Sequence, residues 1–369
     1  MRQRLLLALC AALTASLVLA SLPASALPLS GLADEVSENQ YRTYQVAIQD
    51  MGLGLYGGPA YNQGFRNRYN TGGSATESRG FKEATLYLTN TLTAMGLDVT
   101  VQSDYKNVVA ELPGLATPDR IYIVSGHYDH PQYNGECPGG DDNASGTAAV
   151  LEAARVLSQY RFNATLRFIA WGGEEGWMLG SSDYVNNVVL PGHQNIVGMV
   201  NLDMILRPGW DTSPNEPKDL DVSTGDNPAC NAFANSFLAA GHAYAPSLPF
   251  DSRDPQHEYW YPSDQGPFIA AGYPGLMVAE NTAGEIWGGC NAYYHTANDA
   301  TDRLANDPAN PSHVTYDYGF ATDVVRTTVG FLAQEAQLVE PAVPEPASLS
   351  LLALGACLLR RRLSRRTAA

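Results

Sequence analysis

Three short apolar runs, interrupted by a segment with a helical pattern, limit the fold of this chain more than any other feature. Because each run is apolar at successive positions, we expect it to form a strand that is buried on both faces of a sheet. The runs cover residues 120–125, 165–171 and 196–202. Strands that alternate with helices predict an α/β fold, in which helices cover both faces of a mostly parallel central sheet.

Helical patterns lie before, between and after these runs. The first is predicted from apolar residues at helical spacing, with Gly96 as the C-terminal cap, and these residues are Phe81, Ala84, Leu88, Leu92 and Met95. A second helix should begin at Asn143 or Ser145, and its apolar face comprises Val150, Leu151, Ala154 and Leu157. The last helix is expected at residues 319–334, and short strands are expected at 98–102 and 107–112. The 369 residues allow one large domain or two smaller ones, and the continuous pattern favours one.

Polar side chains follow each apolar run where the predicted strand ends. His127 and Asp129 follow the first run, Glu174 and Glu175 the second, and Asp203 the third. In an open α/β sheet, ligands bind in the crevice beyond the carboxyl ends of the strands. The sequence therefore predicts a functional site at this edge, beside the Asp141-Asp142-Asn143 segment that opens the second helix.

So many carboxylates require a cation if they are buried together, because an unpaired buried charge costs several kcal/mol. Histidine nitrogen and carboxylate oxygen are ligands that Zn²⁺ takes at catalytic sites. Two metal ions can share a carboxylate, so that one activates a nucleophile while the other polarises a carbonyl. His127 and His295 are predicted to supply one nitrogen to each ion.

Five segments, taken in order along the chain, resemble the M28 family of metallopeptidases. They are Ser125-Gly-His-Tyr-Asp129, Gly139-Gly-Asp-Asp-Asn-Ala-Ser-Gly146, Trp171-Gly-Gly-Glu-Glu175, Asn201-Leu-Asp-Met204 and Tyr294-His-Thr-Ala-Asn-Asp299. The resemblance extends from about Asn67 to Leu332 and implies the fold of the zinc-dependent exopeptidases. Each motif alone is weak, whereas five in this order are specific.

The resemblance implies a role for each of these side chains. Asp142 would bridge two zinc ions, and the remaining ligands would be His127 and Asp203 on one ion and Glu175 and His295 on the other. Glu174 would be the general base that takes a proton from the water bridging the ions, which is the nucleophile, and passes it to the leaving amine. Asp129 would hold the second ring nitrogen of His127.

Tyr294 matches a position where some family members place a phenol that stabilises the reaction intermediate, although a packing role is equally consistent with the sequence. His130 is expected to be a solvated loop residue and not a ligand. His257-Glu258 begins like the zincin signature but lacks the second histidine, and no Gly-x-Ser-x-Gly motif supports a serine hydrolase.

Two motifs depart from the family pattern. Members usually carry Ser-Asp-His where this chain has Ser263-Asp264-Gln265. The usual Glu-Glu-x-Gly order reads Glu174-Glu175-Gly176-Trp177 here. Neither change involves a predicted metal ligand, so we expect both to alter the shape of the pocket and the preferred substrate side chain.

The two ends have the composition of targeting segments. Arg2 and Arg4 precede an apolar run that closes on Ala24-Ser25-Ala26, which predicts a signal peptide over residues 1–26 and export of the chain. At the other end a Pro-Glu-Pro motif, an apolar stretch and five arginines resemble the bacterial PEP-CTERM sorting signal. This segment, residues 339–369, implies a processing enzyme of the envelope, transient contact with a membrane, and a mature protein in the envelope or outside the cell. The catalytic domain is predicted over residues 27–338.

Charge and cysteine content narrow the choice of partners. The chain has 22 basic and 38 acidic side chains, and seven of the basic ones lie in the two end segments. The part of the chain between these segments is therefore strongly acidic. Such a surface repels phosphate backbones, which argues against nucleic-acid binding. Outside the ends, the cysteines are Cys137, Cys230 and Cys290. One disulfide is expected, and we favour Cys230 with Cys290, although the sequence leaves the pairing open.

The function predicted from these observations is a two-zinc aminopeptidase that acts on peptides with a free N-terminus. The segments Asn67-Arg68-Tyr69 and Thr282-Ala283-Gly284 are similar to those of secreted bacterial aminopeptidases. A carboxypeptidase or a glutaminyl cyclase on the same fold is an alternative, and the cyclase would hold one zinc ion. A non-catalytic surface or matrix protein is a further alternative, but it would not need a complete set of ligands.

Overall fold

The structure is a computed structural model that describes residues 29–341 with internal gaps. The gaps are residues 56–64, 71–76, 132–134, 209–217, 252–253, 258–262, 282–290, 292 and 303–315. The predicted signal peptide, most of the predicted sorting tail and Cys290 therefore lie outside the described residues. No helix in the described part of the chain is long and apolar enough to cross a membrane.

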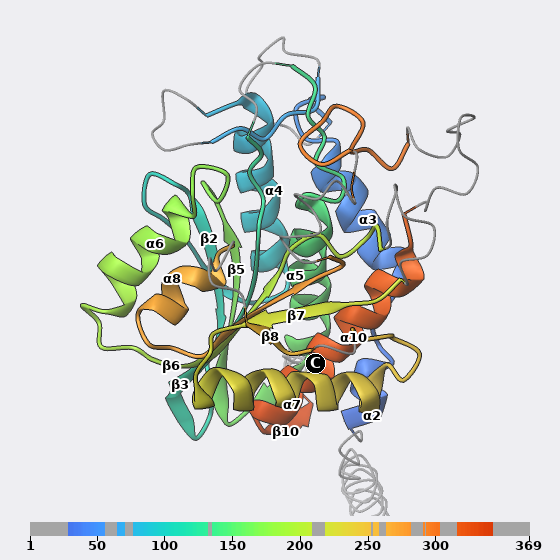
Figure 1. The fold of residues 1–369 in the computed structure, drawn as a ribbon. Coiled ribbons are helices and arrows are strands. Elements are labelled where there is room, and N and C mark those ends of the chain that lie inside the picture. Colours follow the sequence, from blue (N-terminus) through green and yellow to red (C-terminus); the bar gives the residue numbers. More distant parts are fainter. Residues whose placement is uncertain are drawn as a thin grey trace, which may run out of the picture.

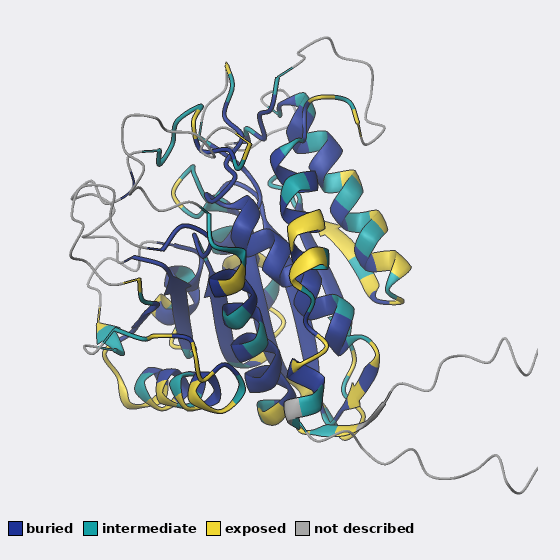
Figure 2. Ribbon diagram, turned by 90° about the vertical axis from the view of Figure 1, so that its right-hand side faces the viewer, coloured by how far each residue is buried: buried dark blue, intermediate teal, exposed yellow. Residues whose placement is uncertain are grey.

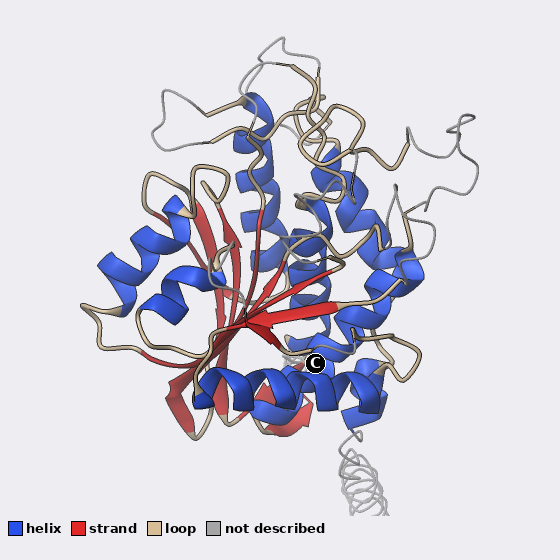
Figure 3. Ribbon diagram, viewed as in Figure 1, coloured by secondary structure: helices blue, strands red, loops and turns tan. Residues whose placement is uncertain are grey.

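An eight-stranded sheet forms the centre of the molecule (Figures 1 and 3). Its strands, in spatial order, are β1 (Asp98–Gln102), β2 (Asn107–Leu112), β5 (Ala164–Trp171), β3 (Thr117–His127), β6 (Asn195–Leu202), β9 (Gly275–Ala279), β7 (Asp221–Thr224) and β8 (Gln256–His257). The central strands β5, β3, β6 and β9 are parallel. The pairs β1–β2, β2–β5 and β7–β9 are antiparallel, and β8 is parallel to β7. The mostly parallel sheet predicted from the sequence is confirmed.

The register of the central strands brings their carboxyl ends to one level. His127 at the end of β3 lies opposite Trp171 at the end of β5. Ser125 in β3 lies opposite Asn201 in β6, so Asp203, two residues later, is level with His127. Side chains from three segments distant in sequence therefore meet at one edge of the sheet.

Helices cover both faces of the sheet. The larger group packs on one face and comprises α2 (Leu29–Ala33), α3 (Glu38–Gln49), α4 (Arg79–Ala94), α5 (Ala144–Leu157), α7 (Pro228–Tyr244) and α10 (Tyr318–Glu335). The opposite face carries α6 (Leu179–Tyr184), the π-helix η1 (Val185–Val189) and α8 (Gln265–Ala270). In Figure 2 the strands and the inner helix faces are buried, whereas the exposed residues lie on the outside.

Alternation along the strands divides the apolar side chains between two cores. In β3, Tyr122 and Val124 pack in the larger core, whereas Ile121 and Ile123 point to the smaller one. Successive side chains of a strand point to opposite faces, so a run that is apolar throughout can be buried on both. This burial explains why the three apolar runs form the interior of the sheet.

The predicted helices begin at side-chain caps. The Ser78 hydroxyl accepts a hydrogen bond from Phe81 N at the start of α4, and the Asn143 side chain accepts one from Gly146 N at the start of α5. Of the two caps considered for α5, the structure has Asn143. Gly96 follows α4 with a φ of +82°, a left-handed conformation that suits glycine at a helix end.

Two details differ from the expectations. Cys230 is buried at the first turn of α7 as a free thiol, with Asn227 Nδ2 3.1 Å from its sulfur. Cys290, its predicted partner, lies outside the described residues. Residues Leu338–Pro341 form β10, which pairs with β4 (Tyr160–Phe162). The folded part therefore continues three residues beyond the predicted end of the domain at residue 338.

Candidate metal centre

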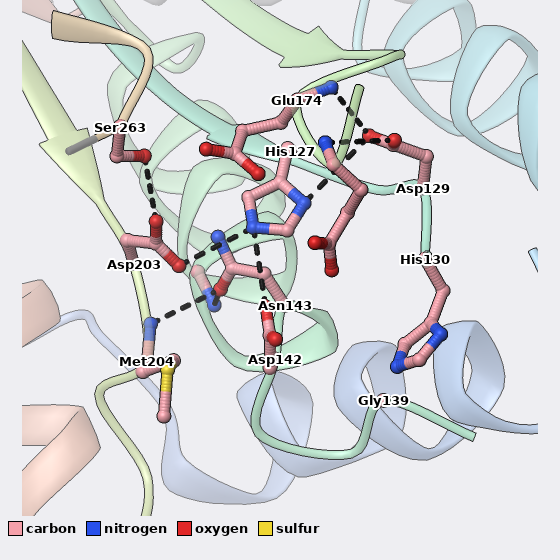
Figure 4. Close-up of polar contacts among 12 residues, drawn as sticks. His127, Asp129, His130, Gly139, Asp142, Asn143, Glu174, Asp203, Met204 and Ser263 are labelled. Carbon is pink, nitrogen blue, oxygen red and sulfur yellow. Dashed lines mark hydrogen bonds and ion pairs between the residues drawn. The ribbon is translucent and has the colours of Figure 1, made fainter. Parts of the chain in front are cut away.

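The predicted site residues meet at the carboxyl edge of the central sheet, and Figure 4 shows His127, Asp142 and Asp203 among them. His127 is the last residue of β3, Asp203 directly follows β6, and Glu174 and Glu175 lie in the turn after β5. Asp142 comes from the loop before α5. His295 comes from a loop after β9 and adopts a φ of +57°. Three neighbouring strands and two loops thus contribute to one cluster.

Asp142 lies at the centre of this cluster. Its Oδ1 atom is 3.3 Å from Nε2 of His127, and its Oδ2 atom is 3.0 Å from Nε2 of His295. One carboxylate therefore faces two imidazoles with separate oxygens. This is the arrangement expected of a carboxylate shared between two ions.

A second carboxylate accompanies each histidine. Asp203 Oδ1 is 3.3 Å from His127 Nε2, and Glu175 Oε2 is 3.1 Å from His295 Nε2. The structure thus divides the five predicted ligands into two halves that share Asp142. We call His127 and Asp203 the strand half, and Glu175 and His295 the loop half.

The site carries more negative than positive charge. Burial raises the pKa of Glu174 well above its ordinary value, His127 lowers it, and Glu175 and Asp264 raise it further. Burial and the neighbouring Asp142 raise the pKa of Glu175 to about 8. Burial lowers the pKa of His127, but Asp203 and Glu174 outweigh this effect and raise it well above the ordinary value. Divalent cations would relieve this crowding of carboxylates.

Asp129 supports the turn that carries both glutamates. Its Oδ1 accepts a hydrogen bond from Glu174 N at 3.1 Å, and its Oδ2 accepts one from Glu175 N at 3.2 Å. The same Oδ1 lies 3.7 Å from Nδ1 of His127, longer than a hydrogen bond. Asp129 is therefore next to the predicted imidazole nitrogen, but its hydrogen bonds fix the Glu174–Glu175 backbone.

A chain of buried polar groups orients Asp203. The Ser263 hydroxyl donates to Asp203 Oδ2 at 2.6 Å and accepts from Asn201 Nδ2 at 2.8 Å. Ser125 then donates to Asn201 Oδ1 at 2.9 Å. Gln265, where the family usually has histidine, accepts from Asn201 Nδ2 at 3.3 Å. Sequence reasoning identified these motifs but assigned no role to Ser263 or Asn201, because only the fold shows that they meet.

The Asp142 loop is held by Asp299, a residue that sequence reasoning also left without a role. Asp299 accepts hydrogen bonds from Asp141 N at 2.9 Å and Asp142 N at 3.0 Å. Tyr316 donates to the same carboxylate at 2.8 Å. Asp299 lies four residues after His295, so this contact ties the Asp142 loop to the loop of the second histidine. Its position at the end of the Tyr294–Asp299 motif is the sequence feature that could have indicated a role in the site.

Tyr294 and His130 are the remaining aromatic groups beside the cluster. Tyr294 stacks on the ring of His295 with the centroids 3.7 Å apart, and burial raises the pKa of its phenol. His130 is fully buried with its Nε2 atom 3.0 Å from Cys137 Sγ, so the expectation of a solvated histidine is wrong. Its backbone N–H donates to Arg68 O at 3.1 Å, which pairs the loop of His130 with the segment around Arg68.

Comparison with known families supports the reading of the motifs. The model of peptidase family M28 matches residues 107–314, more than half of the chain, and this segment contains every member of the cluster. The chain belongs to peptidase family M28. The family match therefore agrees with the motif order found in the sequence. The matched segment runs from the start of β2 to beyond Asp299.

Relatives of this M28 chain include proteins from bacteria and fungi. Leupeptin-inactivating enzyme 1 of Streptomyces exfoliatus is 31% identical over 261 residues, which cover 65% of this chain and 55% of that protein. A probable zinc metalloprotease of Phaeosphaeria nodorum is 28% identical, and the match covers 47% of this chain and 42% of that protein. The chain thus matches only about half, or less, of the length of these relatives.

Solved structures share the fold of this M28 chain at low sequence identity. The LapA aminopeptidase of Legionella pneumophila is 17% identical with a TM-score of 0.60, over 85% of this chain and 75% of that chain. The glutaminyl cyclase of Porphyromonas gingivalis is 18% identical with a TM-score of 0.58, over 81% and 99% of the two chains. Because both enzymes share the fold, the choice between their reactions depends on the site.

Proposed function

We propose that this chain is an aminopeptidase that holds two zinc ions and removes the N-terminal residue of peptides. The observation that carries the proposal is the position of Asp142, whose two oxygens face His127 and His295 at 3.3 and 3.0 Å. Each histidine is completed by its own carboxylate, so the two halves have equivalent sets of ligands.

The donor atoms fit zinc. Each half offers one imidazole nitrogen, one carboxylate oxygen and a share of Asp142, and nitrogen and oxygen donors of this kind bind catalytic Zn²⁺. Glu175 Oε1 is buried without a hydrogen-bond partner among the described residues, which a metal contact would explain. Zinc bound here would supply Lewis-acid chemistry, lowering the pKa of water and polarising the substrate carbonyl.

Glu174 is the residue of this chain that moves the proton. Its carboxylate is buried beside the cluster but is not a member of either half, and Asp129 fixes its backbone. A group so placed can take a proton from the attacking water and give it to the leaving amine. Burial raises its pKa and so makes it a stronger base.

Excess negative charge favours a substrate with a free amino terminus over one with a free carboxylate. Glu174 and Asp264 remain after the predicted ligands are assigned, and both carboxyl groups are buried beside the cluster. An α-ammonium group entering the crevice would be attracted by these carboxylates, whereas a substrate carboxylate would be repelled. The similarity to leupeptin-inactivating enzyme 1 of Streptomyces exfoliatus agrees with action on peptides.

The direct test compares peptides that differ only at their ends. A panel of aminoacyl anilides with free and acetylated amino groups should show hydrolysis of the free set alone. A peptide that begins with glutamine should lose that residue and not cyclise, because a water molecule attacks in this proposal. Release of C-terminal residues, or conversion of N-terminal glutamine to a ring without hydrolysis, would contradict an aminopeptidase.

We also propose that the chain is exported and that its tail is removed by a processing enzyme of the envelope. The support is the signal pattern of residues 1–26 and the Pro-Glu-Pro motif, apolar stretch and arginines of the tail. Mass spectrometry of the mature protein from its host should find neither residues 1–26 nor Cys357. An intact tail on the mature protein would contradict this proposal.

A further inference from the structure

Trp177 belongs to the same closed turn as the two glutamates of the site. Met178 N donates to Glu174 O at 2.7 Å, and Leu179 N donates to Gly173 O at 2.9 Å. Asp129 anchors the other side of this turn through Glu174 N and Glu175 N. Trp177 is therefore fixed close to the reacting groups by hydrogen bonds of the backbone.

The backbone at this position is costly for a residue with a side chain. Trp177 has a φ of +72° and Met178 has a φ of +55°, so two successive residues adopt the left-handed region. Glycine adopts this conformation without the contact between Cβ and the carbonyl oxygen. Glycine is also the residue at this position in the Glu-Glu-x-Gly order that the family usually has. The chain thus keeps a tryptophan where glycine would be the less strained choice.

Packing within the chain does not compensate for this strain. The Trp177 side chain is 84% exposed, the highest value among the exposed large apolar residues of the described chain. An indole usually contributes to stability by burying a large area, and this one buries little. Strained residues concentrate at sites where binding or catalysis uses them. We therefore expect the Trp177 side chain to contact another molecule.

We propose that Trp177 binds the part of a peptide substrate that follows the cleaved bond. This inference rests on the proposed aminopeptidase function. An enzyme that removes one residue encloses that residue in the crevice, and the rest of the peptide must leave across the rim towards solvent. Glu174 gives its proton to the leaving amine, so the leaving chain starts beside the turn that carries Trp177. Trp177 is the most exposed large apolar residue of the described chain, so its indole is available to contact this leaving chain.

The ligand is an aromatic or large apolar side chain in the leaving peptide. Indole rings bind such groups by offset or edge-to-face contacts, which contribute beyond the burial of area. Of the other residues in the turn, Gly176 has no side chain, Glu174 and Glu175 belong to the buried cluster, and Met178 and Leu179 are less exposed than Trp177. Trp177 would therefore be a specificity-determining residue for the position directly after the cleaved bond.

The test compares substrates with and without that side chain. With X as the N-terminal residue that the enzyme cleaves best, the substrates are X-Phe-Gly-Gly, X-Gly-Gly-Gly and X-amide. Trp177→Gly should lower the ratio of kcat/KM for X-Phe-Gly-Gly to that for X-amide about five- to tenfold, mainly through KM. Trp177→Phe should keep most of this preference. The Tm of Trp177→Gly should not fall, since glycine relieves the strained backbone.

A matched control is Leu115→Ala. Leu115 is 51% exposed and precedes β3, at the opposite end of the strand from His127, so its loss should leave the ratio unchanged. A ratio that Trp177→Gly leaves unchanged would overturn the inference. Equal losses on all three substrates would also overturn it, because they would show only that the turn positions the glutamates.

A binding measurement separates this inference from the proposed function. X-Phe-Gly-Gly is titrated calorimetrically into the zinc-loaded Glu174→Gln protein, with and without Trp177→Gly. Weaker binding of about five- to tenfold on loss of Trp177 supports the inference even if the native enzyme hydrolyses nothing, which would refute the proposed function alone. Equal binding by both proteins, or binding by neither, would overturn the inference while leaving hydrolysis to be judged by the substrate panel.

Discussion

The strand half and the loop half of the metal centre are built from similar side chains but are held in different ways. His127 ends the buried strand β3, and its side chain is 1% exposed, whereas His295 comes from a loop and is 33% exposed. Asp203 is fixed by Ser263 and Asn201 from the sheet side. Glu175 depends on the turn that Asp129 anchors.

This difference indicates that the sheet preorganises one position and the loops complete the other. The backbone pairing of the three parallel strands fixes the positions of His127 and of the start of the Asp203 segment. In the loop half, Asp129 accepts a hydrogen bond from Glu175 N, and Asp299, four residues after His295, accepts hydrogen bonds from Asp141 N and Asp142 N. These contacts hold backbone and not the ligand atoms themselves. Ligands on strands are held more precisely than ligands on loops.

The largest effect is expected from the residue that both halves share. Asp142→Ala removes the carboxylate oxygen beside His127 and the one beside His295, so each predicted zinc site loses a ligand. Both ions should therefore be lost or bound weakly. Activity should fall by more than about 10⁴-fold, beyond the contribution of a general base. Zinc content and kcat/KM measure this. Retention of two tightly bound ions in this variant would show that Asp142 does not join the halves.

The next largest effect separates the base from its neighbour. Glu174→Gln should lower kcat about 10²–10⁴-fold and retain both ions, because the amide cannot accept the proton but Glu174 is not a ligand. Glu175→Ala should instead lose the ion of the loop half, since it removes the partner of His295 at 3.1 Å. If Glu174→Gln loses an ion and Glu175→Ala retains both, the assignments of the two glutamates are reversed.

Graded removal of zinc tests the comparison itself. A chelator should release the ion of the loop half first, at a concentration about tenfold lower, because its ligands are more exposed and lie on loops. His295→Ala should abolish the early step and leave the late one. His127→Ala is the matched variant and should affect the late step. Simultaneous release of both ions from the native protein would indicate that the halves are equally stable.

A smaller effect is expected from the support of Asp203. Ser263→Ala removes the hydroxyl that donates to Asp203 Oδ2 at 2.6 Å and leaves the ligand itself in place. Loss of such a partner typically weakens metal affinity or activity about 10- to 100-fold, and the sheet should keep this loss near the lower end. Ser263→Thr retains the hydroxyl and serves as the control. A loss as large as that of Glu175→Ala would mean that the strand half is not preorganised.

The sequence predicted the central sheet and the strand half more fully than the rest. The runs before His127 and Asp203 are apolar at most positions, because burial on both faces of the sheet favours apolar side chains at successive residues. The strands β7 and β9 and helix α7 were not predicted. The roles of Asn201, Ser263 and Asp299 depend on contacts between segments about 60 to 160 residues apart, which no local pattern records. The burial of His130 was missed for the same reason.

The measurement that tests the two-metal proposal most directly is the number of zinc ions bound by the purified, zinc-loaded Glu174→Gln protein. This variant keeps every predicted ligand, so turnover does not complicate the result. Mass spectrometry of this Glu174→Gln protein under non-denaturing conditions should find about two ions per chain, because two halves share Asp142. His295→Ala and His127→Ala should each retain about one. A single tightly bound ion in the Glu174→Gln protein, unchanged by His127→Ala, would contradict the two-metal account.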